Sequence, residues 1–226
     1  MSYIDPFITK KKKTPPNNPN FDKHGMLLRK HACVCGGTGQ GKSGFVMNYI
    51  ANMSNVFKHI YIFSADPNDE SYEKLKDSAH CSGADTDQIH LHTLNELIPC
   101  NELEDGEKLL IIDDWIAESK KKKDELTKYA ILSRKYQCTA LYLAQSWYAT
   151  PPAMRLQMRY AVFCGAPNNA NLNQIVRNLS IPVDKETVIE AIKDATKKPY
   201  DACIVDMHTN NRDKMIRNNF VNFYDI

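Results

Sequence analysis

The chain has 226 residues, with 42% hydrophobic and 25% charged residues, which suits one sizeable globular α/β domain with a proper core. Its formal net charge is only +2, which argues against a globally basic nucleic-acid binder and leaves local basic patches open. No stretch approaches the roughly 20 apolar residues that span a bilayer, and the first residues lack the apolar centre of a secretory signal.

The chain begins with a segment that we expect to be a flexible tail, residues 1–22. A lysine run at 10–13 is followed there by prolines and asparagines, a composition that disfavours a packed core. The remainder, residues 23–226, is expected to form a single domain.

Beyond the tail, apolar runs typical of buried strands alternate with helical patterns. The apolar runs are 31–35, 60–63, 88–94, 109–112, 140–144 and 161–164, and the helical patterns are 43–52, 124–135, 168–179 and 184–195. Two late runs, 202–207 and 215–223, read as an antiparallel pair of strands. This alternation predicts an α/β fold, a three-layer sandwich with a mainly parallel central sheet and late antiparallel strands.

The first apolar run ends in a glycine-rich segment that fits the phosphate-binding (Walker A) pattern G-x-x-x-x-G-K-[ST]. Its members are Gly36, Gly37, Thr38, Gly39, Gln40, Gly41, Lys42 and Ser43. Glycines let successive backbone N–H groups turn toward phosphate oxygens, and a following helix adds the positive end of its dipole. We expect Lys42 to reach the β- and γ-phosphates of ATP and the Ser43 hydroxyl to ligate Mg²⁺.

The apolar run 109–112 ends in two carboxylates, Asp113 and Asp114. A parallel strand would deliver them beside the phosphate-binding loop, as the Walker B half of the site. We expect Asp113 to hold Mg²⁺, directly or through water, and Asp114 to act as the general base for the attacking water. The alternative is that the two aspartates only cap a turn.

A glutamine and three arginines surround the run 140–144. Gln145 follows this run, so it could contact the γ-phosphate if the strand lies between the two motif strands. Arg134, Arg155 and Arg159 flank it, and one of them could neutralise charge in the site of a neighbouring subunit. Each arginine could instead pair with a surface carboxylate.

Two basic groups could contact the phosphates of a polyanion. Lysines 120–123 are expected in a polar loop just after the Walker B strand, and Arg212, Lys214 and Arg217 lie near the end of the chain. A solvated charge run is the alternative for both groups.

The order of these motifs resembles the FtsK/HerA superfamily of DNA-pumping ATPases. More narrowly, it resembles the small genome-packaging ATPases of membrane-containing double-stranded DNA viruses, the tectivirus and poxvirus kind. Besides the two Walker motifs, the segments that carry the resemblance are 133–136, 141–148, 151–152 and 155–159. At position 135 the chain has lysine where poxvirus-type members commonly have histidine.

The resemblance implies a P-loop ATPase domain of the RecA-like (ASCE) kind and a homo-oligomeric ring, usually a hexamer. It implies that ATP hydrolysis moves double-stranded DNA into a viral capsid, with Gln145 as the sensor and Arg134, Arg155 or Arg159 as the arginine finger. Capsid or vertex proteins and viral membrane proteins are the implied partners. The implied locations are the packaging vertex of the virion and the host cytoplasm.

Other functions are compatible with a phosphate-binding loop. A nucleoside or small-molecule kinase needs an acceptor pocket and usually an arginine-rich lid, and the Asp113–Asp114 pair favours water activation instead. A GTP-binding switch would carry an Asn-Lys-x-Asp motif, which does not occur here. A non-packaging DNA translocase or helicase-like ATPase would share every motif named above.

Overall fold

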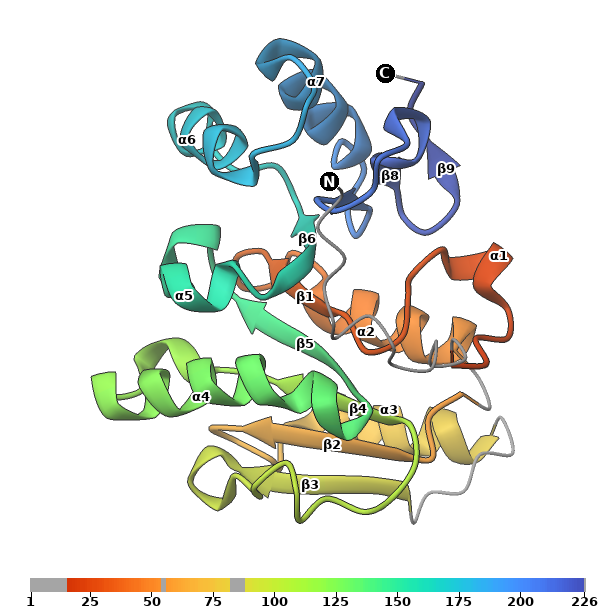
Figure 1. Cartoon of the computed structure of the whole chain (residues 1–226), viewed down its shortest axis with the longest axis vertical. Coiled ribbons are helices and arrows are strands. Elements are labelled where there is room, and N and C mark those ends of the chain that lie inside the picture. The colour runs from red at the N-terminus through yellow and green to blue at the C-terminus, as the bar shows by residue number, and fades with distance from the viewer. Residues whose placement is uncertain (1–15, 54–55, 82–87, 226) are drawn as a thin grey trace, which may run out of the picture.

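The strands in the described part of the chain form one nine-stranded sheet (Figure 1). The computed structural model describes residues 16–53, 56–81 and 88–225. Its strands are β1 (His31–Cys35), β2 (His59–Ser64), β3 (Ile89–Thr93), β4 (Lys108–Ile112), β5 (Cys138–Ala144), β6 (Met158–Cys164), β7 (Ala202–Asp206), β8 (Ile216–Asn218) and β9 (Asn222–Phe223).

The order of the strands across the sheet is β3-β2-β4-β5-β1-β6-β7-β8-β9. The six strands β1 to β6 are parallel to one another, whereas β7 pairs antiparallel with β6, β8 with β7 and β9 with β8. The predicted fold class, a mainly parallel sheet with late antiparallel strands, is therefore confirmed.

Helices cover both faces of the sheet. They are α1 (Phe21–His24), α2 (Lys42–Asn52), α3 (Glu70–Cys81), α4 (Lys120–Leu132), α5 (Pro152–Arg155), α6 (Asn169–Leu179) and α7 (Lys185–Ala195). Side chains of α2 and α3 share one hydrophobic core with the sheet, and those of α4 to α7 share the other. The result is the predicted three-layer sandwich.

Strand β1 illustrates why the central strands are continuous apolar runs. Its side chains alternate between the two cores, with Ala32 and Val34 on the α2 side and Cys33 and Cys35 on the α4–α7 side. A strand that is covered on both faces needs apolar side chains at every position. The same burial holds along the whole of β5.

Several features differ from the sequence predictions. The late run 215–223 is divided into two short strands, β8 and β9. Helix α3 was not predicted, because its described side chains bury only Tyr72 and Leu75 in the core. Lysines 120–123 form the first turn of α4 instead of a loop, and Ser119 caps this turn by accepting a 3.3 Å hydrogen bond from the Lys122 N–H. Arg217 is only 2% exposed. Its side chain is therefore buried and cannot contact the phosphates of DNA as the second basic group was expected to do.

Most of the predicted tail, residues 1–15, lies outside the described residues. Of the described part, Phe21–His24 is a short helix, and the boundary at residue 22 stays a prediction. Among the residues that the structure describes, no helix combines the length and the apolar character that a bilayer crossing requires.

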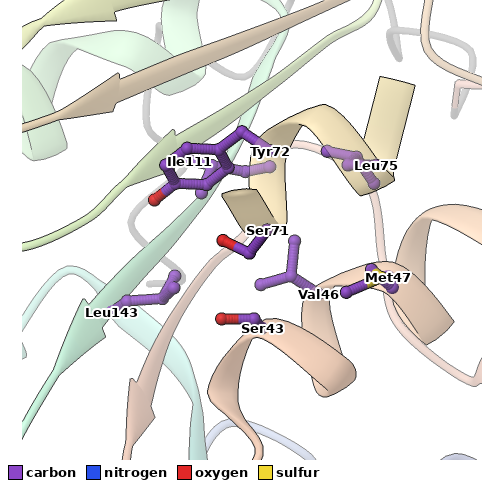
Figure 2. Close-up of a pocket in the computed structure, with 8 residues that line it drawn as sticks. All are labelled: Ser43, Val46, Met47, Ser71, Tyr72, Leu75, Ile111 and Leu143. Carbon is purple, nitrogen blue, oxygen red and sulfur yellow. The ribbon is translucent and has the colours of Figure 1, made fainter. Parts of the chain in front are cut away.

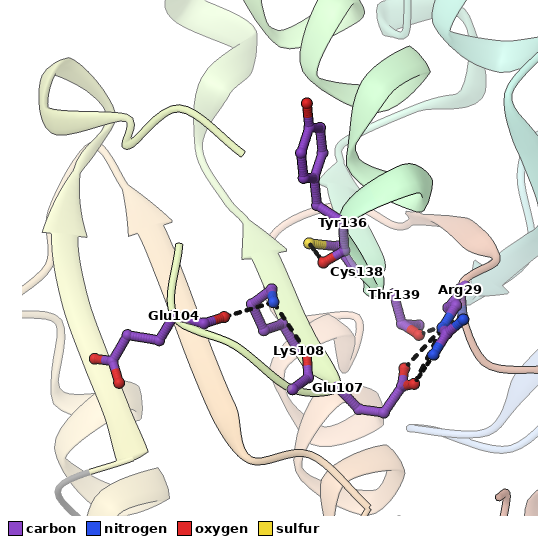
Figure 3. A network of polar contacts seen from close by, with 8 residues as sticks. Arg29, Glu104, Glu107, Lys108, Tyr136, Cys138 and Thr139 are labelled. Carbon is purple, nitrogen blue, oxygen red and sulfur yellow. Dashed lines mark hydrogen bonds and ion pairs between the residues drawn. The ribbon is translucent and has the colours of Figure 1, made fainter. Parts of the chain in front are cut away.

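A network of polar contacts fixes the edge of the sheet where β1, β4 and β5 begin (Figure 3). The Arg29 guanidinium pairs with the Glu107 carboxylate, with 3.0 Å from Nε to Oε1, and the Arg29 N–H donates to Thr139 Oγ1 at 2.8 Å. The buried Lys108 ammonium donates to the carbonyl oxygens of Glu104 and Gly106 at 2.6 and 2.9 Å. These contacts hold the amino edge, and the motif residues occupy the opposite, carboxyl edge.

Candidate nucleotide-binding site

The phosphate-binding loop follows β1 and is wedged between the ends of β5 and β6. The Gly36 N–H donates to the Ala144 carbonyl oxygen at 3.0 Å. A Cβ added at Gly36 would lie 2.6 Å from the Cys164 carbonyl oxygen, so only glycine allows this close approach. The start of the loop is thereby fixed to the two strands that flank β1.

Polar groups of the loop bind one another. Lys42 Nζ, at the start of α2, donates to the carbonyl oxygens of Gly36 and Gly37 at 2.8 and 3.3 Å. The Gly37 N–H donates to Gln40 Oε1 at 2.6 Å. Backbone N–H groups of such a loop are anion-binding donors. A phosphate oxygen would therefore replace the Gln40 amide oxygen as the acceptor of the Gly37 N–H.

Asp113 follows β4 and is held from two sides. Its Oδ2 accepts a hydrogen bond of 2.6 Å from the Tyr72 hydroxyl, and its Oδ1 accepts one of 2.8 Å from the Asp114 N–H. Burial raises the pKa of the Asp113 carboxyl, the charge of Asp114 adds to this rise, and the Tyr72 hydrogen bond opposes it. The neighbouring Asp114 is exposed, with φ of 52° in the left-handed region.

A narrow cavity of about 10 Å³ separates α2 from α3 near Asp113. Figure 2 shows the hydroxyl oxygens of Ser43, Ser71 and Tyr72 turned to the same side of it. The Walker A serine and the tyrosine that binds Asp113 therefore line one space. Hydroxyl and carboxylate oxygens are the ligands that Mg²⁺ prefers, so Ser43 and Asp113 suit the predicted metal site.

Gln145 lies where the strand order requires it for the predicted sensor role. Strand β5 pairs with β1 on one side and β4 on the other, which meets the condition set from the sequence. A cavity of about 100 Å³ is lined by Gln145 and by Gly36 and Gln40 of the loop. Gln145 and the phosphate-binding loop thus border one space, which is large enough to hold water.

The three arginines do not gather around Gln145. Arg155, in α5, lies over the rings of Tyr148 and Trp147, 5.3 and 5.8 Å from Cζ to the ring centroids. Its buried Nη1 has no hydrogen-bond partner among the described residues. Arg155 thus follows the carboxyl end of β5 in the chain and forms no ion pair with a carboxylate among the described residues.

The other two arginines lie at the amino edge of the sheet. Arg134, in the short 3-10 turn η4 (Ser133–Tyr136), is exposed and donates to Gln157 Oε1 at 3.0 Å. Arg159, near the start of β6, forms an ion pair of 2.9 Å with Asp206. Neither reaches the phosphate-binding loop of its own chain, so a finger role for them requires the site of a neighbouring copy.

Tyr72 is the candidate that the sequence patterns do not reveal. It belongs to a mostly polar helix, and its contact with Asp113 spans 41 positions of the chain. No local pattern marks a tyrosine for such a contact, because the contact depends on how α3 packs beside β4.

Solved structures share this fold. The DNA-packaging ATPase B204 from Sulfolobus Turreted Icosahedral Virus superposes with a TM-score of 0.52 at 17% identity, covering 86% of this chain and 98% of that chain. The genome packaging NTPase B204 from Sulfolobus turreted icosahedral virus 2, in complex with sulfate, gives 0.50 at 15% identity, covering 86% and 97%. None of the curated proteins compared matches the sequence.

Comparison with sequence families assigns the chain to a family, whereas the solved structures show only a shared fold. The sequence pattern of the family described as Poxvirus A32 protein matches residues 20–216. This span includes both Walker motifs, Gln145 and all three candidate arginines. The chain therefore belongs to the Poxvirus A32 protein family.

Proposed function

We propose that the protein is an ATP-driven motor that moves double-stranded DNA into a viral capsid. The observation that carries the proposal is the strand order β4-β5-β1, which gathers the two Walker motifs and Gln145 at one edge of the sheet. Membership of the Poxvirus A32 protein family and a fold shared with DNA-packaging ATPases support the same function.

The residues of the carboxyl edge have distinct roles in hydrolysis. Lys42 and the N–H groups of residues 36–43 would bind the phosphates of ATP, while Ser43 and Asp113 would hold Mg²⁺. When bound, Mg²⁺ neutralises charge on the phosphate oxygens. The exposed Asp114 carboxylate accepts the proton of the attacking water, and Gln145 orients that water.

A ring of identical subunits, with six favoured, would complete each site with an arginine from a neighbour. Leu156 is 79% exposed and lies next to Arg155 and to Gln157, the residue that binds Arg134. Ile131 and Leu132, at the end of α4, are also exposed. Exposed apolar residues around candidate fingers are consistent with a surface that a second copy covers.

Lysines 120–123 are the proposed contact with DNA phosphates. They occupy the first turn of α4, where the helix dipole disfavours positive charge. Lys122 pairs with Glu125 at 2.8 Å, and the other three lysines form no ion pair among the described residues. A polyanion would relieve this repulsion and bind without reading sequence.

The wider assembly follows from the same proposal. Capsid or vertex proteins, and viral membrane proteins, would dock the ring at the packaging vertex of the virion after synthesis in the host cytoplasm. Residues 1–22 would be a tail available for docking, and residues 23–226 the P-loop ATPase domain.

The first experiment measures ATP hydrolysis with and without double-stranded DNA. We expect the rate to rise several-fold with DNA in the native protein, and we expect Lys42→Met to be inactive in both conditions. Hydrolysis that is indifferent to DNA, together with phosphorylation of an added small acceptor, would favour a kinase and overturn the motor.

The second experiment asks whether subunits share sites. An inactive Asp114→Asn protein is mixed in turn with Arg134→Ala, Arg155→Ala and Arg159→Ala proteins, and hydrolysis is measured in the presence of DNA. Partial recovery in one mixture identifies the finger, because a native arginine and a native aspartate then meet in one site. If none of the three mixtures recovers activity, the hypothesis that subunits share active sites is wrong.

A further inference from the structure

The loop between α7 and β7 brings an aromatic side chain, Tyr200, to the carboxyl edge of the sheet. Strand β7 runs antiparallel to β6, and Ala202 at its start pairs with Cys164 at the end of β6. The residues just before β7 therefore lie at the edge where the parallel strands end. This is also the edge of the phosphate-binding loop.

Tyr200 contacts that loop directly. A Cβ added at Gly41 would lie 3.1 Å from Tyr200 Cδ1 and 3.3 Å from its Cα. Gly41 also has φ of +93°, in the left-handed region. The turn into α2 therefore favours glycine at position 41, and a Cβ there would also press against Tyr200.

The ring of Tyr200 is not used by the core. The residue is 75% exposed, although it lies against the loop. Its backbone has φ of 68°, a conformation that bulky side chains rarely adopt. A strained backbone that holds an exposed aromatic ring beside a ligand-binding loop is the kind of feature that marks a contact with the ligand.

We propose that Tyr200 is the platform on which the base of the bound nucleotide stacks. The inference rests on the proposed function, because the phosphates must first lie in residues 36–43. A π face accepts any base, so Tyr200 adds affinity for nucleoside triphosphates over inorganic polyphosphate without selecting adenine. Base selectivity then belongs to other residues.

The test compares two ligands by calorimetry on the full chain with Mg²⁺, ATP and inorganic tripolyphosphate, which has no base. Tyr200→Ala should weaken ATP binding about tenfold and leave tripolyphosphate binding unchanged. Tyr200→Phe should keep native affinity for both ligands, because its ring is retained. Tyr136→Ala removes a partly exposed tyrosine at the opposite edge and should change neither affinity.

Tyr200→Gly separates the base contact from damage to the fold. Glycine adopts a positive φ without strain, so this variant should unfold at or above the native temperature while losing the same affinity as Tyr200→Ala. Native ATP affinity in Tyr200→Ala, or an equal loss for ATP and tripolyphosphate, would overturn the inference.

Lys42→Met separates a failure of the nucleotide site from a failure of the base contact at Tyr200. If Lys42→Met weakens both ligands while Tyr200→Ala changes neither, the nucleotide site stands and the base platform is wrong. If the native protein binds neither ligand, or Lys42→Met binds both normally, the proposed function fails and Tyr200 loses its role with it.

Discussion

Two lysines at opposite edges of the sheet make the same kind of contact in different surroundings. Lys42 donates to the carbonyl oxygens of Gly36 and Gly37, and Lys108 donates to those of Glu104 and Gly106. Lys108 is 3% exposed, whereas Lys42 is half-buried at the open side of its loop. One ammonium is enclosed by protein, and the other can exchange its carbonyl partners for phosphate oxygens.

The same difference extends along both edges. At the amino edge, charged groups are paired within the chain, as in Arg29 with Glu107 and Arg159 with Asp206. At the carboxyl edge, Asp114 and Gln145 are exposed. The polar residues at the amino edge fix the strands of the sheet, whereas those at the carboxyl edge are the ones that we propose bind the nucleotide.

The largest expected effect separates the two lysines. Lys42→Met should lower the rate of ATP hydrolysis about 10³-fold, or about 4 kcal/mol, because a positive charge on the transferring phosphoryl group is lost. Its unfolding temperature should stay close to the native value. Steady-state hydrolysis and thermal unfolding measure the two quantities.

Lys108→Met is the matched control for that prediction. It should lower the free energy of unfolding by about 2 kcal/mol, because two carbonyl oxygens lose a charged donor, and leave hydrolysis per folded molecule unchanged. A stable Lys108→Met protein without ATPase activity would contradict the assignment of the amino edge to stability and the carboxyl edge to hydrolysis.

The next largest effect concerns Arg159. Arg159→Ala should lower the free energy of unfolding by about 3 kcal/mol, since the buried Asp206 carboxylate loses its cation. Adding Asp206→Asn should recover part of this loss in denaturant unfolding. If hydrolysis falls in Arg159→Ala but not in Asp206→Asn, Arg159 acts in catalysis as well as in the fold.

A third effect is a loss of stability in acid caused by His31. Burial, and then the charge of Arg134, lowers the pKa of His31 from 6.5 to about 3. The unfolded chain therefore binds a proton that the folded chain does not, so the stability contributed above pH 6.5 is lost as the pH falls toward 3. From these pKa values we expect the free energy of unfolding to fall by about 2 kcal/mol between pH 7 and pH 5.

Denaturant unfolding at several pH values checks this prediction, with His31→Gln as the comparison. Glutamine does not titrate, so the acid loss should be smaller in the variant than in the native protein. Equal slopes in the two proteins would contradict the assignment to His31.

The smallest effect tests the contact between Tyr72 and Asp113. Tyr72→Phe removes one hydrogen bond, which should lower the free energy of unfolding by about 1 kcal/mol. Because this hydrogen bond lowers the pKa of Asp113, its loss should move the acid limb of the pH–rate profile for ATP hydrolysis to higher pH. An unshifted limb would mean that Asp113 does not titrate in the catalytic cycle.

The sequence predicted the parts of the fold that depend on local patterns. Strands β1, β2 and β4 to β7 each contain an apolar run, and Gly39 and Gly41 of the Walker A motif have the positive φ that favours glycine. Helix α3 has no clear apolar pattern in the sequence, because few of its residues are buried. The charge of lysines 120–123 suggests a loop, but the helix propensity of lysine and the cap at Ser119 place them in a helix.

The rest of the site depends on contacts between distant segments. The roles of Tyr72 and Tyr200 follow from how α3 and β7 lie beside the Walker motifs, and no spacing in the chain reports that. The position of Gln145 was predicted only conditionally, until the strand order confirmed it. Arg134 and Arg159 flank Gln145 in sequence but lie at the opposite edge of the sheet, because a strand separates each of them from the carboxyl edge, and their finger role stays a prediction.

The most direct test of the central claim, that hydrolysis at the carboxyl edge moves DNA, is displacement of the third strand from a DNA triplex by the full chain with ATP and Mg²⁺. A protein that travels along duplex DNA strips the third strand, and we expect release by the native protein and none by Asp114→Asn. DNA-stimulated hydrolysis without release of the third strand would contradict the motor.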